Sequence, residues 1–345
     1  MTLQARVALA AAVVCPAAVL LAIPEHAGQP SWATGEELSS PGLFAPGDVS
    51  TGDYESHPAF TSDGRELFYV KSNAVFTSWT IVVSRFGVGR WSTPRVAPFS
   101  GQYNDADPLV TPDGRRLYFI SDRPRAAGDT RTDMDIWYVD RTPEGWHAPV
   151  NLGPPVNSPA SEWFPTLAAD GTLYFGSGRE GGKGATDLYR AAPTEGGAFR
   201  EPENLGSAIN TAADEYEPLI SPDQTLLIFM AAGRKDSLGD GDLYISRAVA
   251  GTWTPAKNLG RPINSPAREI SPYITPDRKY FFFSSARQIR SRPQAARTYE
   301  EVIAGLRGPG NGLGDLYRLN LDAVLSGVRH DERDSGASQP GARWH

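Results

Sequence analysis

The sequence lacks most of the residues and motifs on which thiol, nucleic-acid and common hydrolytic chemistry depend. Its 345 residues include one cysteine, Cys15, so we expect neither a disulfide framework nor a reactive thiol in the folded domain. The net charge of −7 argues against a nucleic-acid partner, which would require a basic face. The motifs G-x-S-x-G, H-E-x-x-H and the P-loop are missing. These absences leave carboxylates, histidine and aromatic groups as the candidates for function.

Residues 1–27 hold the longest apolar run and predict a signal peptide or an N-terminal anchor. Arg6 precedes the run, which is short for a membrane span and lacks a clear polar stop. A cleaved signal would remove Cys15 and place the protein in the periplasm or outside the cell. A buried N-terminal helix and lipidation of Cys15 are the alternatives, although Val14 stands where a lipoprotein signal has a small residue. Residues 28–41 are then a linker, and the polar segment 328–345 predicts a disordered tail.

Glycine and proline are plentiful, at 35 and 29 residues, and they mark the turns of a repeated unit. The unit is clearest in residues 161–190. It has a carboxylate three residues before a proline, an Asp-Gly turn, an alternating apolar strand, Ser-x-Arg, a glycine-rich turn and Asp-Leu-Tyr. This order predicts an antiparallel meander, and a fourth strand follows in segments such as WHAPVNLG. Five copies are present, with turn aspartates at Asp63, Asp113, Asp170, Asp223 and Asp277.

The last copy lacks a fourth strand of its own, and the N-terminal segment 42–58 supplies a replacement. Ser50 precedes Glu55 by five residues, just as Asn210 precedes Glu215 in the segment that leads into the fourth copy. A strand from this segment would complete the last blade, close the ring and protect its edges. The sequence therefore predicts that residues 42–327 form one all-β domain, a five-bladed β-propeller of four-stranded antiparallel blades closed by an N-terminal strand.

The repeat motifs resemble those of a known family. The TPDG or SPDG turn, LYF-S-x-R, DLY and the NLG-x-x-IN linker are similar to the TolB-type β-propeller repeat, most of all to its periplasmic, OmpA-associated versions. The resemblance covers approximately Leu43–Asn320. It implies the propeller fold, but propellers host many activities, so it does not select one.

The fifth copy carries an insertion between its second and third strands. Thr298 is placed as an N-cap, Glu301 stands at the capping-box position, and Gly308 with Pro309 provides a stop. These signals predict a short helix from Thr298 to Leu306.

A carboxylate stands three residues before the first-strand proline in every copy. The five are Glu55, Asp105, Glu162, Glu215 and Glu269. Because first strands line the channel of a propeller, we expect a ring of carboxylates at one mouth, with Asp107 and Glu217 adding charge. Such a ring would raise the pKa of its members or hold a divalent cation such as calcium. Alternatively, each carboxylate accepts backbone N–H groups and serves the repeat structurally.

Arginines at the ends of second strands are expected to pair with the aspartates that begin third strands. Across one hairpin the pairs would join Arg123, Arg179 and Arg287 to Asp135, Asp187 and Asp315. Departures from the repeat carry more functional information. His57, Trp163 and Tyr216 would bring an imidazole and aromatic rings to the same mouth, unless the two aromatic residues pack between blades.

These features favour an exported binding or scaffold module without a cofactor. We expect a monomer that docks a protein, peptide or glycan of the cell envelope on its channel-mouth face. The alternative is a carbohydrate-active enzyme, a glycoside hydrolase or lyase, that uses two of the mouth carboxylates as acid and base or nucleophile. Carboxylates capped by backbone N–H groups would argue against the enzyme, whereas two free carboxylates about 5–10 Å apart would support it.

Overall fold

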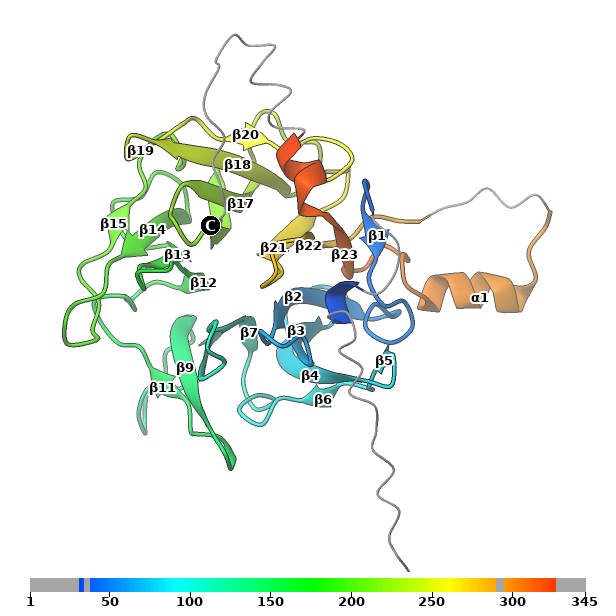
Figure 1. Ribbon diagram of the computed structural model, residues 1–345, viewed down its shortest axis with the longest axis horizontal. Coiled ribbons are helices and arrows are strands. Elements are labelled where there is room, and N and C mark those ends of the chain that lie inside the picture. Colours follow the sequence, from blue (N-terminus) through cyan, green and yellow to red (C-terminus); the bar gives the residue numbers. More distant parts are fainter. Residues whose placement is uncertain (1–30, 34–37, 290–294, 327–345) are drawn as a thin grey trace, which may run out of the picture.

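Five sheets stand around a common axis in the computed structural model (Figure 1), which describes residues 31–33, 38–289 and 295–326. Each sheet is one blade, and neighbouring strands within it are antiparallel. The predicted all-β, five-bladed propeller is therefore confirmed. Residues 1–27 and 328–345, for which a signal or anchor and a tail were predicted, lie outside the described residues.

Each blade consists of three longer strands and a short or interrupted fourth. Blade 1 holds β2 (Tyr54–Phe60), β3 (Glu66–Ser72), β4 (Trp79–Gly87), β5 (Arg90–Trp91) and β6 (Arg95–Val96). Blade 2 holds β7 (Asp105–Val110), β8 (Arg116–Ser121), β9 (Asp135–Thr142), β10 (Gly145–Trp146) and β11 (Val150–Asn151). Blade 3 holds β12 (Glu162–Leu167), β13 (Leu173–Ser177), β14 (Asp187–Ala191) and β15 (Glu203–Asn204). Blade 4 holds β16 (Asp214–Ile220), β17 (Leu226–Ala232), β18 (Asp242–Val249), β19 (Thr252–Trp253) and β20 (Lys257–Asn258).

Blade 5 is built from both ends of the propeller sequence. It holds β21 (Glu269–Ile274), β22 (Tyr280–Ser285) and β23 (Asp315–Asn320), and its outer strand is β1 (Gly42–Leu43). Ser50 exchanges hydrogen bonds with the backbone N–H and C=O of Leu316, as Asn210 does with Leu188 in blade 3. The predicted alignment of Ser50 with Asn210 and the predicted closure are both confirmed.

The N-terminal approach to β1 also packs on the propeller. Ser31–Ala33 forms the short 3-10 helix η1, in which Trp32 is 2 % exposed and makes an edge contact with Phe60. Its indole N–H donates to Asp277 at 2.9 Å. This part of the segment expected to be a linker is thus held against the turn between the first and second strands in blades 1 and 5, at Gly64 and Asp277.

The insertion in blade 5 forms the expected helix, α1 (Tyr299–Arg307). Thr298 is its N-cap, and a complete capping box joins Thr298 to Glu301. None of its residues is buried, and it projects from the edge of the propeller (Figure 1). Within the described ranges, no helix is long and apolar enough to cross a membrane.

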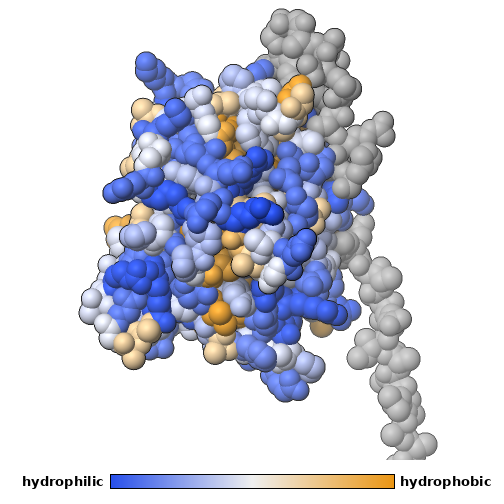
Figure 2. Space-filling view, turned by 90° about the vertical axis from the view of Figure 1, so that its left-hand side faces the viewer, coloured by the Kyte–Doolittle hydropathy of each residue, from blue (hydrophilic) through white to orange (hydrophobic). Residues whose placement is uncertain are grey.

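The outer wall offers little apolar surface on the side shown in Figure 2, which is the side of β11 and β15. Hydrophilic atoms dominate this face, and apolar atoms gather only in narrow strips between them. The large apolar side chains lie instead between the blades, where Phe119, Phe229 and Phe281 are fully buried. This wall is therefore a poor candidate for a binding face, and the channel is the better place to search.

Candidate functional site

Every first strand carries a bulge at the same place. The register with the second strand shifts across two residues, the second of which is the repeated proline. The residue before the proline has a left-handed backbone in all five blades, with φ of 55° at His57, 54° at Asp107, 47° at Phe164, 56° at Glu217 and 60° at Ser271. Such a conformation costs a non-glycine residue about 1–3 kcal/mol, and strain of this kind clusters at functional sites. The bulges therefore direct attention to these five positions.

Three of the bulge residues meet although they belong to blades 1, 2 and 4. His57 Nε2 lies 2.9 Å from Asp107 Oδ1 and 3.1 Å from Glu217 Oε1. The second oxygen of Asp107 accepts the Phe164 N–H at 2.8 Å, and the second oxygen of Glu217 accepts the Ser271 N–H. Because residues from such separate blades meet only near the axis, this trio crosses the central channel.

The trio holds a charged imidazole inside the protein. His57, Asp107 and Glu217 are 4 %, 6 % and 9 % exposed. Burial alone lowers the pKa of His57, but the charge of Asp107, the hydrogen bonds to both carboxylates and the charge of Glu217 outweigh it. The pKa of His57 is raised from 6.5 to about 10, so the imidazole is protonated at neutral pH.

The five repeated carboxylates have a different environment. All are 0 % exposed: Glu55, Asp105, Glu162, Glu215 and Glu269. Glu162 accepts the Ser158 N–H at 3.0 Å and the Ser158 and Ser177 hydroxyls, and it pairs with Arg179 at 3.3 Å. Glu215, Glu269 and Glu55 repeat the capping by a backbone N–H four residues upstream. Asp105 is held by the Ser100 hydroxyl and by Arg123. These carboxylates fasten the linker that enters each blade.

The predicted pairing of the second-strand arginines is wrong. Arg123 binds Asp105 at 2.6 Å, and Arg179 and Arg287 bind the corresponding first-strand glutamates, each at 3.3 Å. Each of these arginines also donates from Nε to the serine two residues before it, which turns the guanidinium toward the first strand. The third-strand aspartates use other donors. Asp187, for example, accepts two backbone N–H groups and the Asn204 amide.

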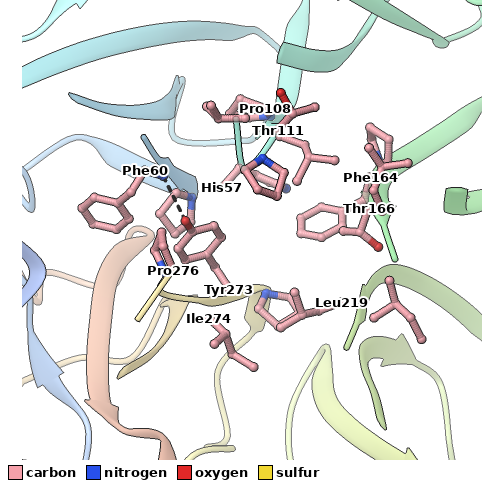
Figure 3. A pocket seen from close by; sticks show the side chains of 18 of the residues that line it. His57, Phe60, Pro108, Thr111, Phe164, Thr166, Leu219, Tyr273, Ile274 and Pro276 are labelled. Atoms are coloured by element: carbon pink, nitrogen blue, oxygen red, sulfur yellow. Dashed lines mark hydrogen bonds between the residues drawn. The ribbon is translucent and has the colours of Figure 1, made fainter. Parts of the chain in front are cut away.

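The trio separates two cavities along the axis. The cavity on the side of the Asp-Gly turns, here the turn-side cavity, has a volume of about 270 Å³. Figure 3 shows His57 at its base, with Phe164, Leu219 and Tyr273 around it and several repeat prolines at its wall. This cavity is largely apolar.

The second cavity, here the mouth cavity, opens on the side of the blade-to-blade linkers and has a volume of about 330 Å³. Its aromatic walls come from Phe76, Trp79, Trp163 and Tyr216. The trio forms its base, and Asp214, Asp240 and Arg268 add charges. The Trp79 and Trp163 rings meet edge to face at 6.2 Å, and Phe76 stacks on His57 at 6.2 Å. The cavity thus combines aromatic surface with both signs of charge, as ligand sites commonly do.

The predicted site residues separate into two groups. The mouth cavity is lined by His57, Asp107, Trp163, Tyr216 and Glu217, whereas the five carboxylates that begin the repeats are buried beside the linkers. Sequence reasoning did not single out Phe76, Trp79 or Arg268. The variation directly before the first-strand proline indicates the bulge positions but not these three residues, none of which stands there.

Cations of the chain itself neutralise much of the carboxylate charge. Lys71 pairs with Glu55 at 2.5 Å, four arginines serve the other repeated carboxylates, and His57 lies between Asp107 and Glu217. Within the part of the chain that the structure describes, no group of three or more His, Cys, Asp or Glu side chains is arranged to hold a metal ion. The expectation of a divalent cation at the mouth gains no support from this geometry.

No protein-family model matches this chain, and no curated protein matches it. Solved structures are similar at low identity. The α-L-arabinofuranosidase PaAbf62A from Podospora anserina is 14% identical, with 83% of this chain and 98% of that chain covered and a TM-score of 0.46. A putative TolB from Agrobacterium tumefaciens is 14% identical, with 78% and 90% covered and a TM-score of 0.45. Hydrazine synthase from Kuenenia stuttgartiensis is 12% identical, with 78% and 41% covered and a TM-score of 0.48. These values carry no argument about the activity of this chain.

Proposed function

We propose that the protein is an exported, monomeric binding module of the cell envelope that docks a protein, peptide or glycan in the mouth cavity. The observation that carries this proposal is the aromatic cavity built over the strained residues of the channel. Phe76 and Trp79 come from blade 1, Trp163 from blade 3 and Tyr216 from blade 4. Several blades thus contribute to one concave site, which is how rigid scaffolds commonly present binding groups.

Export and the nature of the partner are supported by the sequence. Residues 1–27 have the composition of a signal or anchor, and the only cysteine lies within them. The negative net charge disfavours a nucleic-acid partner. Closure of blade 5 by β1 completes the ring of blades, which reduces the tendency of the sheets to pair with another copy.

The contacts of the two axial carboxylates favour binding over glycoside hydrolysis. Asp107 and Glu217 contact the same His57 nitrogen at 2.9 and 3.1 Å, so the two contacting oxygens are close enough to be considered as an acid and base acting on a glycosidic bond. However, one oxygen of each is paired with the imidazole and the other accepts a backbone N–H. Both carboxylates are thus held in place by donors of the protein, and proton transfer to a substrate would have to compete with these contacts. The five repeated carboxylates are excluded as catalytic groups for the same reason, because donors of the protein already hold them.

Peptide and glycan arrays probed with the purified protein test this function. We expect a defined set of ligands whose signal is lost in Trp163→Ala, because the aromatic wall is removed. Leu167→Ala is the matched control, since Leu167 lines the turn-side cavity, and it should leave the signal unchanged. Aryl glycosides are assayed in parallel. Turnover that disappears in Glu217→Gln, or ligand binding lost only in the turn-side variant, would contradict the proposal.

A further inference from the structure

We infer that the mouth cavity accepts a basic side chain, the lysine or arginine of a partner protein. This inference rests on the proposed function and specifies the chemistry of its partner. It is carried by the balance of charges around the cavity, by the aromatic walls and by the contrast with the cavity on the other side of the same trio.

Acidic groups outnumber basic groups around the mouth cavity. Its lining includes four carboxylates, those of Asp107, Asp214, Glu217 and Asp240, against the two cations His57 and Arg268. At the base, a single imidazolium serves two carboxylates at 2.9 and 3.1 Å. Among the described residues no second cation lies within ion-pair distance of these two carboxylates, whose other oxygens accept backbone N–H groups in a region shielded from water. An added cation is favourable in such a place because Coulomb attraction is strong where the dielectric is low.

The walls favour the same kind of ligand. Cations are attracted to the faces of Trp, Tyr and Phe rings, by about 0.5–2 kcal/mol within about 6 Å of a ring centroid. Trp163 and Tyr216 occupy equivalent positions in blades 3 and 4, one residue after the repeated glutamate of their blades. Tyr216 is flanked in the mouth lining by Asp214 and Glu217. Aromatic faces interleaved with carboxylates are suited to an ammonium or guanidinium group.

The turn-side cavity provides an internal comparison. It shares His57 and Asp107 with the mouth cavity, but its other charged lining residue is Arg278, so basic groups outnumber acidic ones. Its walls are proline-rich and combine aliphatic groups such as Leu219 with the aromatic rings of Phe164 and Tyr273 (Figure 3), so the contrast between the two cavities lies in their charge. A cation is therefore directed to the mouth cavity, although both cavities reach the same histidine.

An extended basic side chain suits the mixed lining of the mouth cavity. The trio lies at its base, and its volume is about 330 Å³. Lysine and arginine have slender apolar stems that pack along aromatic surface while the charged head reaches polar partners. An extended basic side chain can thus place its stem between Trp163 and Tyr216 and its head toward Glu217.

Binding of short peptides to the full protein, measured by calorimetry and by tryptophan fluorescence, tests the inference. The probes are acetyl-Gly-Lys-Gly-amide, its arginine and glutamine counterparts, and glucosamine as a cationic sugar. We expect the lysine or arginine peptide to bind at least about tenfold more tightly than the glutamine peptide, and this preference to weaken at high salt. Fluorescence should change because Trp79 and Trp163 line the cavity.

Three variants locate the site. Asp240→Asn removes an exposed rim charge with little risk to the fold, and it should reduce the preference for lysine over glutamine about threefold or more. Trp163→Leu should weaken binding of the lysine and arginine peptides alike. Arg278→Gln, in the turn-side cavity, is the control and should change neither.

The possible results separate this inference from the proposed function. Equal binding of lysine and glutamine peptides, still lost in Trp163→Leu, would overturn the cation assignment while leaving a binding site at the mouth. Tighter binding of glucosamine than of either basic peptide would overturn the assignment to a protein side chain. Binding of none of the probes would also reject the inference, and the array experiment would then decide the proposed function independently.

Discussion

Carboxylates in this propeller have two roles, which depend on their distance from the first-strand proline. Three residues before the proline, as at Glu162, a carboxylate is enclosed by hydroxyl, amide and arginine donors. One residue before it, as at Asp107 and Glu217, a carboxylate reaches the axis and meets a histidine from another blade. The bulge at this point explains the difference, because an extra residue re-aims the side chains that follow it. The invariant charge is thus structural, and the varied position is the candidate for function.

Glu162→Gln is expected to destabilise the fold and not to act selectively on binding. The substitution leaves Arg179 without its buried carboxylate partner, and breaking a buried ion pair costs about 3 kcal/mol or more. Glu203→Gln is the matched control, since Glu203 forms an exposed pair with Arg190 whose loss should cost less than about 1 kcal/mol. Urea unfolding of both variants measures the difference. Equal stability of Glu162→Gln and the wild type would contradict the structural role.

His57 should make stability depend on pH above neutrality. Its pKa in the folded protein is raised to about 10, from an ordinary value of 6.5. The stabilisation from the charged imidazole is therefore fully present below about pH 6.5 and is lost as the pH rises through about 10. We expect the melting temperature of the wild type to fall across this range more than that of His57→Gln. His147→Gln, at an exposed histidine, should behave like the wild type, and parallel curves for all three proteins would refute the prediction.

The closure of blade 5 differs from blades 2, 3 and 4 in one side chain. Asn151, Asn204 and Asn258 stand opposite the third residue of their third strands, and each donates to the aspartate that begins that strand. In blade 5 this position is Leu43, opposite Tyr317. Asp315 is left with the Gly310 N–H, and its Oδ1 has no hydrogen-bond partner among the described residues. Burial, only partly offset by this hydrogen bond, raises the pKa of Asp315 from 3.8 to about 7.

Asp315→Asn is expected to raise the melting temperature at pH 8. The folded-state pKa of Asp315 is raised, so stability from this group is present below about pH 4 and is lost as the pH rises through about 7. A neutral amide removes that loss, and the gain over the wild type should shrink at pH 5. Asp242→Asn is the control in blade 4, where two backbone N–H groups and Asn258 satisfy the carboxylate. Asp242→Asn should lower the melting temperature. A similar decrease in Asp315→Asn would contradict the prediction, because it would show that the Asp315 carboxylate has its hydrogen bonds satisfied.

The molecule as a whole is held closed from its N-terminal side. β1 completes the sheet of blade 5, Phe44 packs against Phe282 at 4.9 Å, and Trp32 reaches Asp277 beside the turn-side cavity. α1 and the mouth cavity belong to connections on the opposite side of the blades from the Asp-Gly turns. Trp32 thus lies on the turn side, whereas the later part of the closing segment reaches the mouth side at Gly52, whose C=O accepts the Asn311 amide at 3.1 Å. The described residues of this segment do not line the mouth cavity. Closure should affect stability without directly touching a ligand.

Removal of residues 1–50 is expected to lower the melting temperature sharply. The truncation deletes the outer strand of blade 5 and buried side chains including Trp32, Phe44 and Val49. Removal of residues 1–30 alone is the control and should have little effect. Thermal unfolding followed by circular dichroism compares the two, and an unchanged transition in the longer truncation would contradict closure by the N-terminal segment.

The sequence by itself determined the architecture of this protein. Blade number, strand order, the capped helix α1 and closure through Ser50 all follow from local signals, such as alternating apolar residues, Asp-Gly turns and a capping box. Each of these signals spans only a few residues. Five copies repeat most of them, so a strand or turn that is ambiguous in one copy can be assigned from the others.

The tertiary structure alone decided the charge pairing and the site. His57 and Glu217 are separated by 160 residues, and no local pattern indicates that blades 1 and 4 meet across the axis. The sequence places carboxylates before the first strand and at the start of the third, and only the contacts of Arg179 with Ser177 and Glu162 show that it pairs with the first. The bulge changes the direction of the side chains, so two positions that are two residues apart, and would share a face of a regular strand, become a buried support and an axial group. The alternation of side chains along each first strand can be read from the sequence. The bulge that interrupts it forms a site only because the five first strands meet at the axis.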